Sequence, residues 1–174
     1  MKVLNYLVIL TLLACLTGCN PNDDEKDINA DVETYIRLLK SNQYDSPKLP
    51  SFTPGDIPGL LQYRNDTQLI NQFPRNPISS YHGGECKLGM YVLWTIESIR
   101  AESINHNNYM VMGFPSQNPV LALKASDQLV MVFDDTFHAA AAQAYYGWWT
   151  GNQNTGFDAF KSIDPLEGTD YRWH

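Results

Sequence analysis

The stretch CKLGMYVLWTIESIRAES, residues 86–103, decides the fold expected for this chain. Its apolar residues point in nearly every direction when they are placed on a helix of about 3.6 residues per turn. A helix that is apolar all round is a buried one. We therefore expect residues 85–102 to form the central helix of the fold. Glu97 and Arg100 lie about one turn apart on it and are candidates for a buried or half-buried ion pair with a structural role.

Segments on the N-terminal side of this stretch have helical patterns of their own. Apolar residues spaced i, i+3, i+4, i+7 predict an amphipathic helix that Asn29 or Asp31 caps and that ends near Lys40. The sequence TPGD at residues 53–56 has the spacing of a capped helix start with proline in the first turn. A further short helix is predicted over residues 66–73.

The C-terminal side combines an irregular region with another helix. Residues near 105–133 are rich in Asn, Gly and Pro, which favours an irregular or minor β segment. The apolar run LVMVF at residues 129–133 is expected to be buried. From Asp134 a helical pattern returns, and Gly151 suits its end. Together these patterns predict a mostly all-α fold, a compact helical domain around a buried central helix.

The N-terminus has the features of an export signal. A positive start is followed by an apolar run that is too short to span a hydrocarbon core of about 30 Å. The sequence LTGC at residues 16–19 resembles the bacterial lipobox. That resemblance implies a signal peptide over residues 1–18 and acylation of Cys19, with chains such as palmitate anchoring the protein in a membrane. The alternative is an ordinary signal peptide that is cut elsewhere, with Cys19 a structural thiol.

An acidic segment follows the cysteine. Residues 19–29 lack large apolar side chains before Ile28 and are expected to form a flexible tether to a single helical domain over residues 30–174. The acids of residues 23–27 resemble the surface-export signal of Bacteroidota lipoproteins. This resemblance implies display on the outer face of the outer membrane, and the periplasmic face is the alternative.

The amino-acid composition makes one class of binding partner unexpected. The formal net charge is −7 at pH 7 and no Lys/Arg cluster is present, so nucleic acid is not expected as a partner. Of three cysteines, Cys15 would leave with the signal and Cys19 would be acylated, which leaves Cys86 alone. Free cysteine is among the most buried residue types, so we expect Cys86 to be buried. No cofactor motif is recognisable.

Two pairs of residues have spacings that occur in active sites. His82 and Cys86, with Glu85 between them, offer a thiol nucleophile and a base, but no third group that orients the histidine is identifiable. Asp134 and His138 share a helix face, yet two ligands are too few for a metal site. The expected roles are therefore a loop histidine and a buried cysteine for the first pair, and a capping aspartate and a surface histidine for the second. Three of these residues meeting in one open pocket would favour an enzyme.

The sequence YYGWW at residues 145–149 is an aromatic cluster. Tyr145, Trp148 and Trp149 share one side of a helix and are expected to belong mainly to the core, whereas Tyr146 points away. Exposed aromatic side chains stack on sugars and anchor protein interfaces. Tyr146, Trp148 and Trp149 are therefore the candidate surface for a protein or glycan partner.

Five stretches, taken in order, resemble a Bacteroidota lipoprotein family of unknown function. They are LPSFTPGDIPGLLQY (49–63), FPRNPISS (73–80), LGMYVLWTIESIR (88–100), AYYGWW (144–149) and IDPLEGTDYRW (163–173). The resemblance implies a small, mostly helical exported domain and supplies no catalytic residue. We therefore expect a lipid-anchored envelope protein that acts as a non-enzymatic binding or accessory module. The alternatives are a small exported hydrolase and a structural component of an envelope complex.

Overall fold

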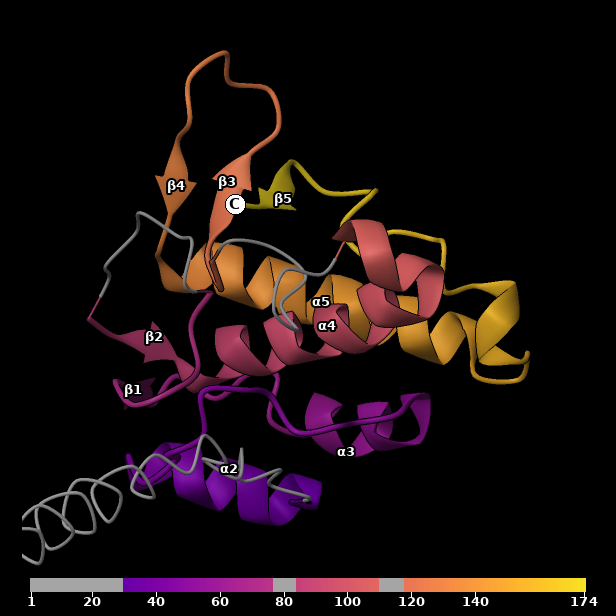
Figure 1. The fold of residues 1–174 in the computed structure, drawn as a ribbon. Coiled ribbons are helices and arrows are strands. Elements are labelled where there is room, and N and C mark those ends of the chain that lie inside the picture. Colours follow the sequence, from indigo (N-terminus) through magenta and orange to yellow (C-terminus); the bar gives the residue numbers. More distant parts are fainter. Residues whose placement is uncertain (1–29, 77–83, 110–117) are drawn as a thin grey trace, which may run out of the picture.

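The computed structural model describes residues 30–76, 84–109 and 118–174 (Figure 1). The signal peptide of residues 1–18, the acylated Cys19 and the tether of residues 19–29 lie outside the described residues and stay predictions.

Helices form the body of the described structure. The α-helices are α2 (Val32–Lys40), α3 (Ile57–Leu61), α4 (Leu88–Tyr109) and α5 (Asp135–Asn152), and the 3₁₀ turns are η2 (Pro54–Asp56) and η3 (Phe157–Ala159). Helix α4 lies in the middle, with α5 along one side and α3 and then α2 along the other (Figure 1). No described helix is both long and apolar enough to cross a membrane.

Two small antiparallel sheets accompany the helices, so the mostly all-α prediction is wrong and the fold is a mixture of helices and strands. The strands are β1 (Leu69–Ile70), β2 (Cys86–Lys87), β3 (Leu121–Leu123), β4 (Met131–Val132) and β5 (Tyr171–Trp173). Strand β1 pairs with β2, and the second sheet has the order β4-β3-β5. Strands of two or three residues are too short to show the apolar–polar alternation by which a strand is predicted.

Helix α4 is the buried centre, although its bounds differ from the prediction of 85–102. It begins only at Leu88, because Cys86 and Lys87 pair with β1. The N–H groups of Leu88 and Gly89 donate to the carbonyl oxygens of Gln68 and Asp66, both at 2.8 Å. These bonds satisfy donors that a helix start leaves open. They also fix the chain between α3 and β1 against the start of the central helix.

The predicted helix near residues 31–40 is confirmed as α2. Asp31 caps it by accepting a hydrogen bond of 2.7 Å from Thr34 N. The Tyr35 hydroxyl lies 3.0 Å from the Thr95 hydroxyl of α4 within the core. The cap therefore orients a helix whose apolar face is joined to the centre of the fold by a buried polar contact as well as by packing.

Two predictions on other segments are wrong. Residues 66–73 contain strand β1 in place of a helix, and Asp66 instead accepts a backbone hydrogen bond of 2.9 Å from Gln68 N. The run at residues 129–133 is not buried: Leu129, Val130 and Phe133 are exposed. It forms the outer strand of a β3–β4 hairpin that extends away from the helices (Figure 1). An apolar run therefore lies on an open edge.

A buried polar network joins α4, α5 and β5. The predicted pair of Glu97 and Arg100 is confirmed, with Arg100 Nε donating to Glu97 Oε2 at 2.9 Å. The Tyr145 hydroxyl donates to the same oxygen at 2.8 Å, and Trp173 Nε1 donates to the Tyr145 hydroxyl at 2.8 Å. Arg100 Nη1 also donates to the Lys161 carbonyl at 3.0 Å. The network ties the last strand to the central helix.

Candidate functional site

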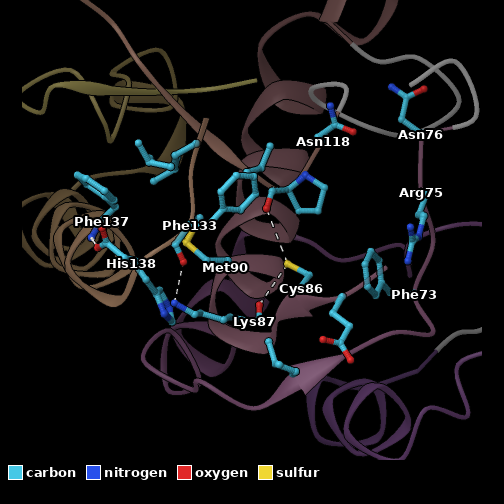
Figure 2. Close-up of a pocket in the computed structure, with 17 residues that line it drawn as sticks. Phe73, Arg75, Asn76, Cys86, Lys87, Met90, Asn118, Phe133, Phe137 and His138 are labelled. Carbon is cyan, nitrogen blue, oxygen red and sulfur yellow. Dashed lines mark hydrogen bonds between the residues drawn. The ribbon is translucent and has the colours of Figure 1, made fainter. Parts of the chain in front are cut away.

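A pocket of about 230 Å³ opens where the β3–β4 hairpin meets the first turns of α4 and α5 (Figure 2). Most of its lining is apolar. The side chains that contribute this apolar surface are Leu69, Phe73, Met90, Val120, Leu121, Val132, Phe133 and Phe137. Ligand pockets in proteins are commonly of this size class or larger and are lined mainly by apolar groups with a few polar ones.

The rim of the pocket is apolar and exposed. The side chains of Leu69 and Phe133 line the pocket and are 53% and 56% exposed. A single exposed apolar residue needs no explanation, but exposed apolar residues around a concave apolar site indicate a binding surface. Leu69 belongs to β1 and Phe133 directly follows β4, so the rim connects the neighbourhoods of both sheets around the opening.

Charged residues hold the mouth of the pocket in shape. Lys87 Nζ donates to the Phe133 carbonyl oxygen at 3.0 Å (Figure 2). It also donates to Asp135 Oδ1 at 2.6 Å. These hydrogen bonds fix the position of the Lys87 side chain. They also join β2 to the end of β4 and to the start of α5. Arg75 donates to the Gly84 carbonyl at 3.0 Å, and its guanidinium lies 4.5 Å from the centre of the Phe73 ring. Lys87 and Arg75 therefore position the walls of the pocket, and the lining also includes the exposed side chain of Glu85.

Cys86 lies in the pocket lining and is buried, as predicted. Its Sγ lies 3.4 Å from the Lys87 carbonyl oxygen and 3.7 Å from that of Pro119. Burial raises the pKa of the thiol to about 12. Because the thiolate is the nucleophile, the environment of this cysteine is the opposite of an activating one.

His138 lies in the first turn of α5 and Asp134 is the cap of that helix, as predicted. His138 is buried, so the expectation of a surface histidine is wrong. His138 Nε2 donates to the Arg64 carbonyl oxygen at 2.7 Å; a carbonyl can only accept, so this nitrogen carries the proton. Burial lowers the pKa of His138, which keeps the ring neutral at neutral pH. Asp134 caps α5 by accepting hydrogen bonds from Thr136 N at 2.8 Å and Phe137 N at 3.2 Å.

Three of the four sequence-predicted candidates, Cys86, Asp134 and His138, do line one pocket. The fourth, His82, lies outside the described residues. Figure 2 shows Cys86 near the centre of the view and His138 to one side, beside Phe137. This convergence favours an enzyme, but the chemistry opposes it, since the thiol is protonated, the imidazole proton is committed to a carbonyl and the carboxylate caps a helix. Throughout the described segments, no group of three His, Cys, Asp or Glu residues is placed to hold a metal ion.

We expect Cys86 to react slowly with iodoacetamide at pH 8, because a thiol with a pKa of about 12 is almost entirely protonated there. The rate should be roughly a hundredfold or more below that of an ordinary cysteine. The readout is alkylation of the peptide that contains Cys86, followed by mass spectrometry, and protein unfolded in urea is the control that should react at the ordinary rate. A native rate equal to the control would support the nucleophile hypothesis instead.

The aromatic cluster divides between the core and the surface. Tyr145 and Trp148 are buried, and Trp149 is half-buried. The Trp148 ring packs edge-on against Phe160, with ring centroids 5.2 Å apart. Tyr146 is 40% exposed, and the Arg64 guanidinium lies 4.1 Å from the centre of its ring. Trp148 therefore belongs to the core, as expected. A contact with a partner through Tyr146 and Trp149 stays a prediction.

The apolar lining of the pocket was missed in the sequence. Its walls come from segments around residues 69–76, 85–90, 118–121 and 132–138, which only the tertiary structure brings together. One signal was present. The run at 129–133 has strand-forming residues and ends at an acidic helix cap, a pattern that also suits an exposed hairpin strand.

Comparison with known proteins gives a family and no activity. No curated protein and no solved structure matches the chain. A family model described as a domain of unknown function, DUF4943, matches residues 26–174. That match covers all the described residues and most of the sequence. The chain therefore belongs to the DUF4943 family of uncharacterised domains.

Proposed function

We propose that this protein is a lipid-anchored protein of a bacterial cell envelope that binds a ligand without catalysing a reaction. The pocket at the base of the β3–β4 hairpin receives an apolar group of that ligand. The LTGC sequence at residues 16–19 supports the anchor, and the acids of residues 23–27 support display on the outer surface of the outer membrane of a Bacteroidota species.

The observation that carries the binding role is the pocket itself. It is concave and mainly apolar, its rim residues Leu69 and Phe133 are exposed, and its basic side chains, its thiol and its Asp134 carboxylate make hydrogen bonds within the fold. Covering Leu69 and Phe133 with a ligand would remove apolar surface from water, which is worth about 25 cal/mol per Å². A pocket that is open, apolar and held by fixed charges suits binding better than bond breaking.

Indole is a probe of suitable size and polarity for this pocket. In full-length acylated protein held in lipid nanodiscs, with ¹³C-labelled methionine methyl groups, indole should shift the Met90 methyl signal saturably, since Met90 lines the pocket. Phe133→Ser should weaken the interaction about fivefold by removing a wall of the pocket.

The matched control for this experiment is Ile163→Ser. Ile163 is also an exposed apolar side chain, but it does not line the pocket, so its replacement should leave the indole affinity unchanged. A Met90 signal that does not respond to millimolar indole, or equal effects of the two substitutions, would contradict the pocket as the binding site.

The anchor is tested by labelling cells with radioactive palmitate. The wild-type protein should incorporate label and Cys19→Ala should not, because the thiol of residue 19 is the proposed attachment point. Deleting residues 23–27 is the matched control: it should leave the label in place and change only whether protease added outside the cells reaches the protein. An unlabelled wild type would rule out the anchor, and unchanged protease access would rule out the export role of the acids.

A further inference from the structure

Among residues 30–76, 84–109 and 118–174, no segment pairs with the outer edge of β4, so backbone hydrogen-bonding groups there are without a described partner. In the antiparallel register, Leu121 is opposite Val132 and Ala122 is opposite Met131, and Leu123 N donates to the Val130 carbonyl at 3.0 Å. Alternate residues of such a ladder exchange hydrogen bonds with the neighbouring strand. Val130 and Val132 therefore bond toward β3, whereas Met131 turns its N–H and C=O outward.

Apart from its short length, this edge lacks the features that usually protect one. Proteins protect sheet edges with very short strands, charged side chains, proline or bulges. From Leu129 to Phe133 the chain has neither charge nor proline, and Leu129, Val130 and Phe133 are exposed. In the described structure β4 pairs only with β3, and no described segment covers its outer side. The edge is short, apolar and open, and it lies directly beside the pocket that Val132 and Phe133 line.

One end of the edge is closed. Lys87 Nζ donates a hydrogen bond of 3.0 Å to the Phe133 carbonyl oxygen, so this oxygen already has a partner. A strand that adds to β4 therefore finds free backbone groups at Met131 and, two residues earlier, on the same side of the chain, at Leu129. The Lys87 contact thus sets where the added ladder ends, and it places that end at the mouth of the pocket.

The charges beside the edge disfavour a second copy of this chain as the occupant. If two β4 strands paired antiparallel, the acids that flank the strand, which are Asp127 before it and Asp134 and Asp135 at the start of α5, would be brought near those of the other copy. Like charges placed opposite each other destabilise a strand pair. Of these three acids, only Asp135 has its charge offset by Lys87, whose Nζ lies 2.6 Å from Asp135 Oδ1. A strand with basic residues at both ends has the complementary charge.

A lipid surface also suits this edge poorly. The outward N–H and C=O of Met131 would have no partner in hydrocarbon, where each unsatisfied backbone group costs several kcal/mol. Asp127 and Asp134 would meet the negative headgroups of an anionic bilayer. A peptide backbone, in contrast, supplies both the acceptor and the donor that Met131 needs.

We propose that an extended peptide segment adds to β4 as an antiparallel fourth strand of the sheet. Its centre is apolar at alternate positions, so that one side chain enters the pocket, and its ends carry lysine or arginine beside Asp127 and Asp134. This inference rests on the proposed function, because it takes the pocket as the ligand site and identifies the ligand class. Strand addition of this kind obtains affinity from main-chain bonds and specificity from side-chain pockets.

The probe is a blocked, fluorescent heptapeptide with lysine at both ends and alternating valine and threonine between them, titrated against full-length acylated protein in nanodiscs. Fluorescence anisotropy should show saturable binding, and a peptide with glutamate in place of lysine should bind at least about tenfold more weakly. Met131→Pro removes one outward N–H without touching the bonds to β3, and it should weaken binding about fivefold or more. Met131→Leu is the matched control and should bind as the wild type does.

Two further peptides keep the test independent of any effect of the proline on folding. Backbone N-methylation at alternate positions blocks hydrogen bonding on one side of the added strand. Methylation in one register should abolish binding to wild-type protein, and methylation in the other register should leave it intact. Equal binding by the two peptides, or unchanged binding by Met131→Pro, would overturn strand addition.

The outcomes separate this inference from the proposed function. Peptide binding that Phe133→Ser weakens but Met131→Pro does not would keep the pocket and reject strand addition. Indole binding without any peptide binding would do the same, whereas loss of both would reject the proposed function. Slow hydrogen exchange at Met131 without peptide would mean that the edge is already covered, by a second copy if the protection falls on dilution and by lipid if it does not, and either result would overturn the peptide proposal.

Discussion

Gly89→Ala is expected to destabilise the fold by about 3 kcal/mol or more, since overpacking and loss of a buried hydrogen bond act together. A Cβ atom at Gly89 would lie 2.5 Å from the Arg64 carbonyl oxygen and 2.5 Å from His138 Nε2. These two atoms form a hydrogen bond of 2.7 Å with each other, so neither can move away from the new Cβ atom without breaking that bond. The substitution therefore separates the start of α4 from α5 and from the segment after α3.

Gly147→Ala in α5 is the matched control for this prediction. A Cβ atom there would meet nothing within 4 Å. Because alanine is a better helix former than glycine, this variant should gain about 0.5–1 kcal/mol. Equilibrium unfolding in urea measures both. Equal stabilities for the two variants would show that Gly89 is not closely packed.

Glu97→Gln is expected to cost about 3–5 kcal/mol, because it leaves the Arg100 guanidinium buried without its counter-charge. The side chains of Glu97 and Arg100 are only 9% and 12% exposed. Burial by itself would lower the pKa of Arg100, but the Glu97 carboxylate more than offsets it, so the pKa is raised and the charge stays. The glutamine would also lose the charge-assisted character of the hydrogen bond from Tyr145.

The surface pair of Asp158 and Lys161 provides the control, with the same i,i+3 spacing and an N–O distance of 2.6 Å. Asp158 is 90% exposed, so Asp158→Asn should cost less than about 1 kcal/mol. Adding Arg100→Met to Glu97→Gln should recover part of the lost stability by removing the unpaired buried charge. A Glu97→Gln variant no less stable than Asp158→Asn would mean that water reaches the pair.

Local patterns predicted the helical part of the fold well. The all-round apolar character of α4 indicated its burial, the cap of α2 was one of the two predicted candidates, and the spacing of Glu97 and Arg100 gave their ion pair. In each case the residues that decide the outcome are near one another in the sequence. Helical spacing and capping are local properties, so a single sequence carries them.

The sheets and the pocket depend on distant residues and could not be predicted in that way. Strand β3 pairs with β5, so that Leu121 is opposite Trp173. The sequence of neither segment indicates that the other is its partner. The same applies to the pocket, where Phe73 and Val132 are brought together by the packing of β1 and β4 around the helices. The apolar character of residues 129–133 predicts burial, but it carries no information on which strand lies at the edge of a sheet, and the run is exposed.

The pairing of β3 with β5 also has a consequence for folding. In a chain whose β5 has not docked, the β3–β4 hairpin would have both of its outer edges unpaired. Docking of β5 pairs one edge with Trp173 and its neighbours, and it also lets Trp173 donate to Tyr145, which completes the network around Glu97. Closure of the sheet and completion of the buried network therefore depend on the same strand, and a chain with β5 undocked would expose strand edges that favour aggregation.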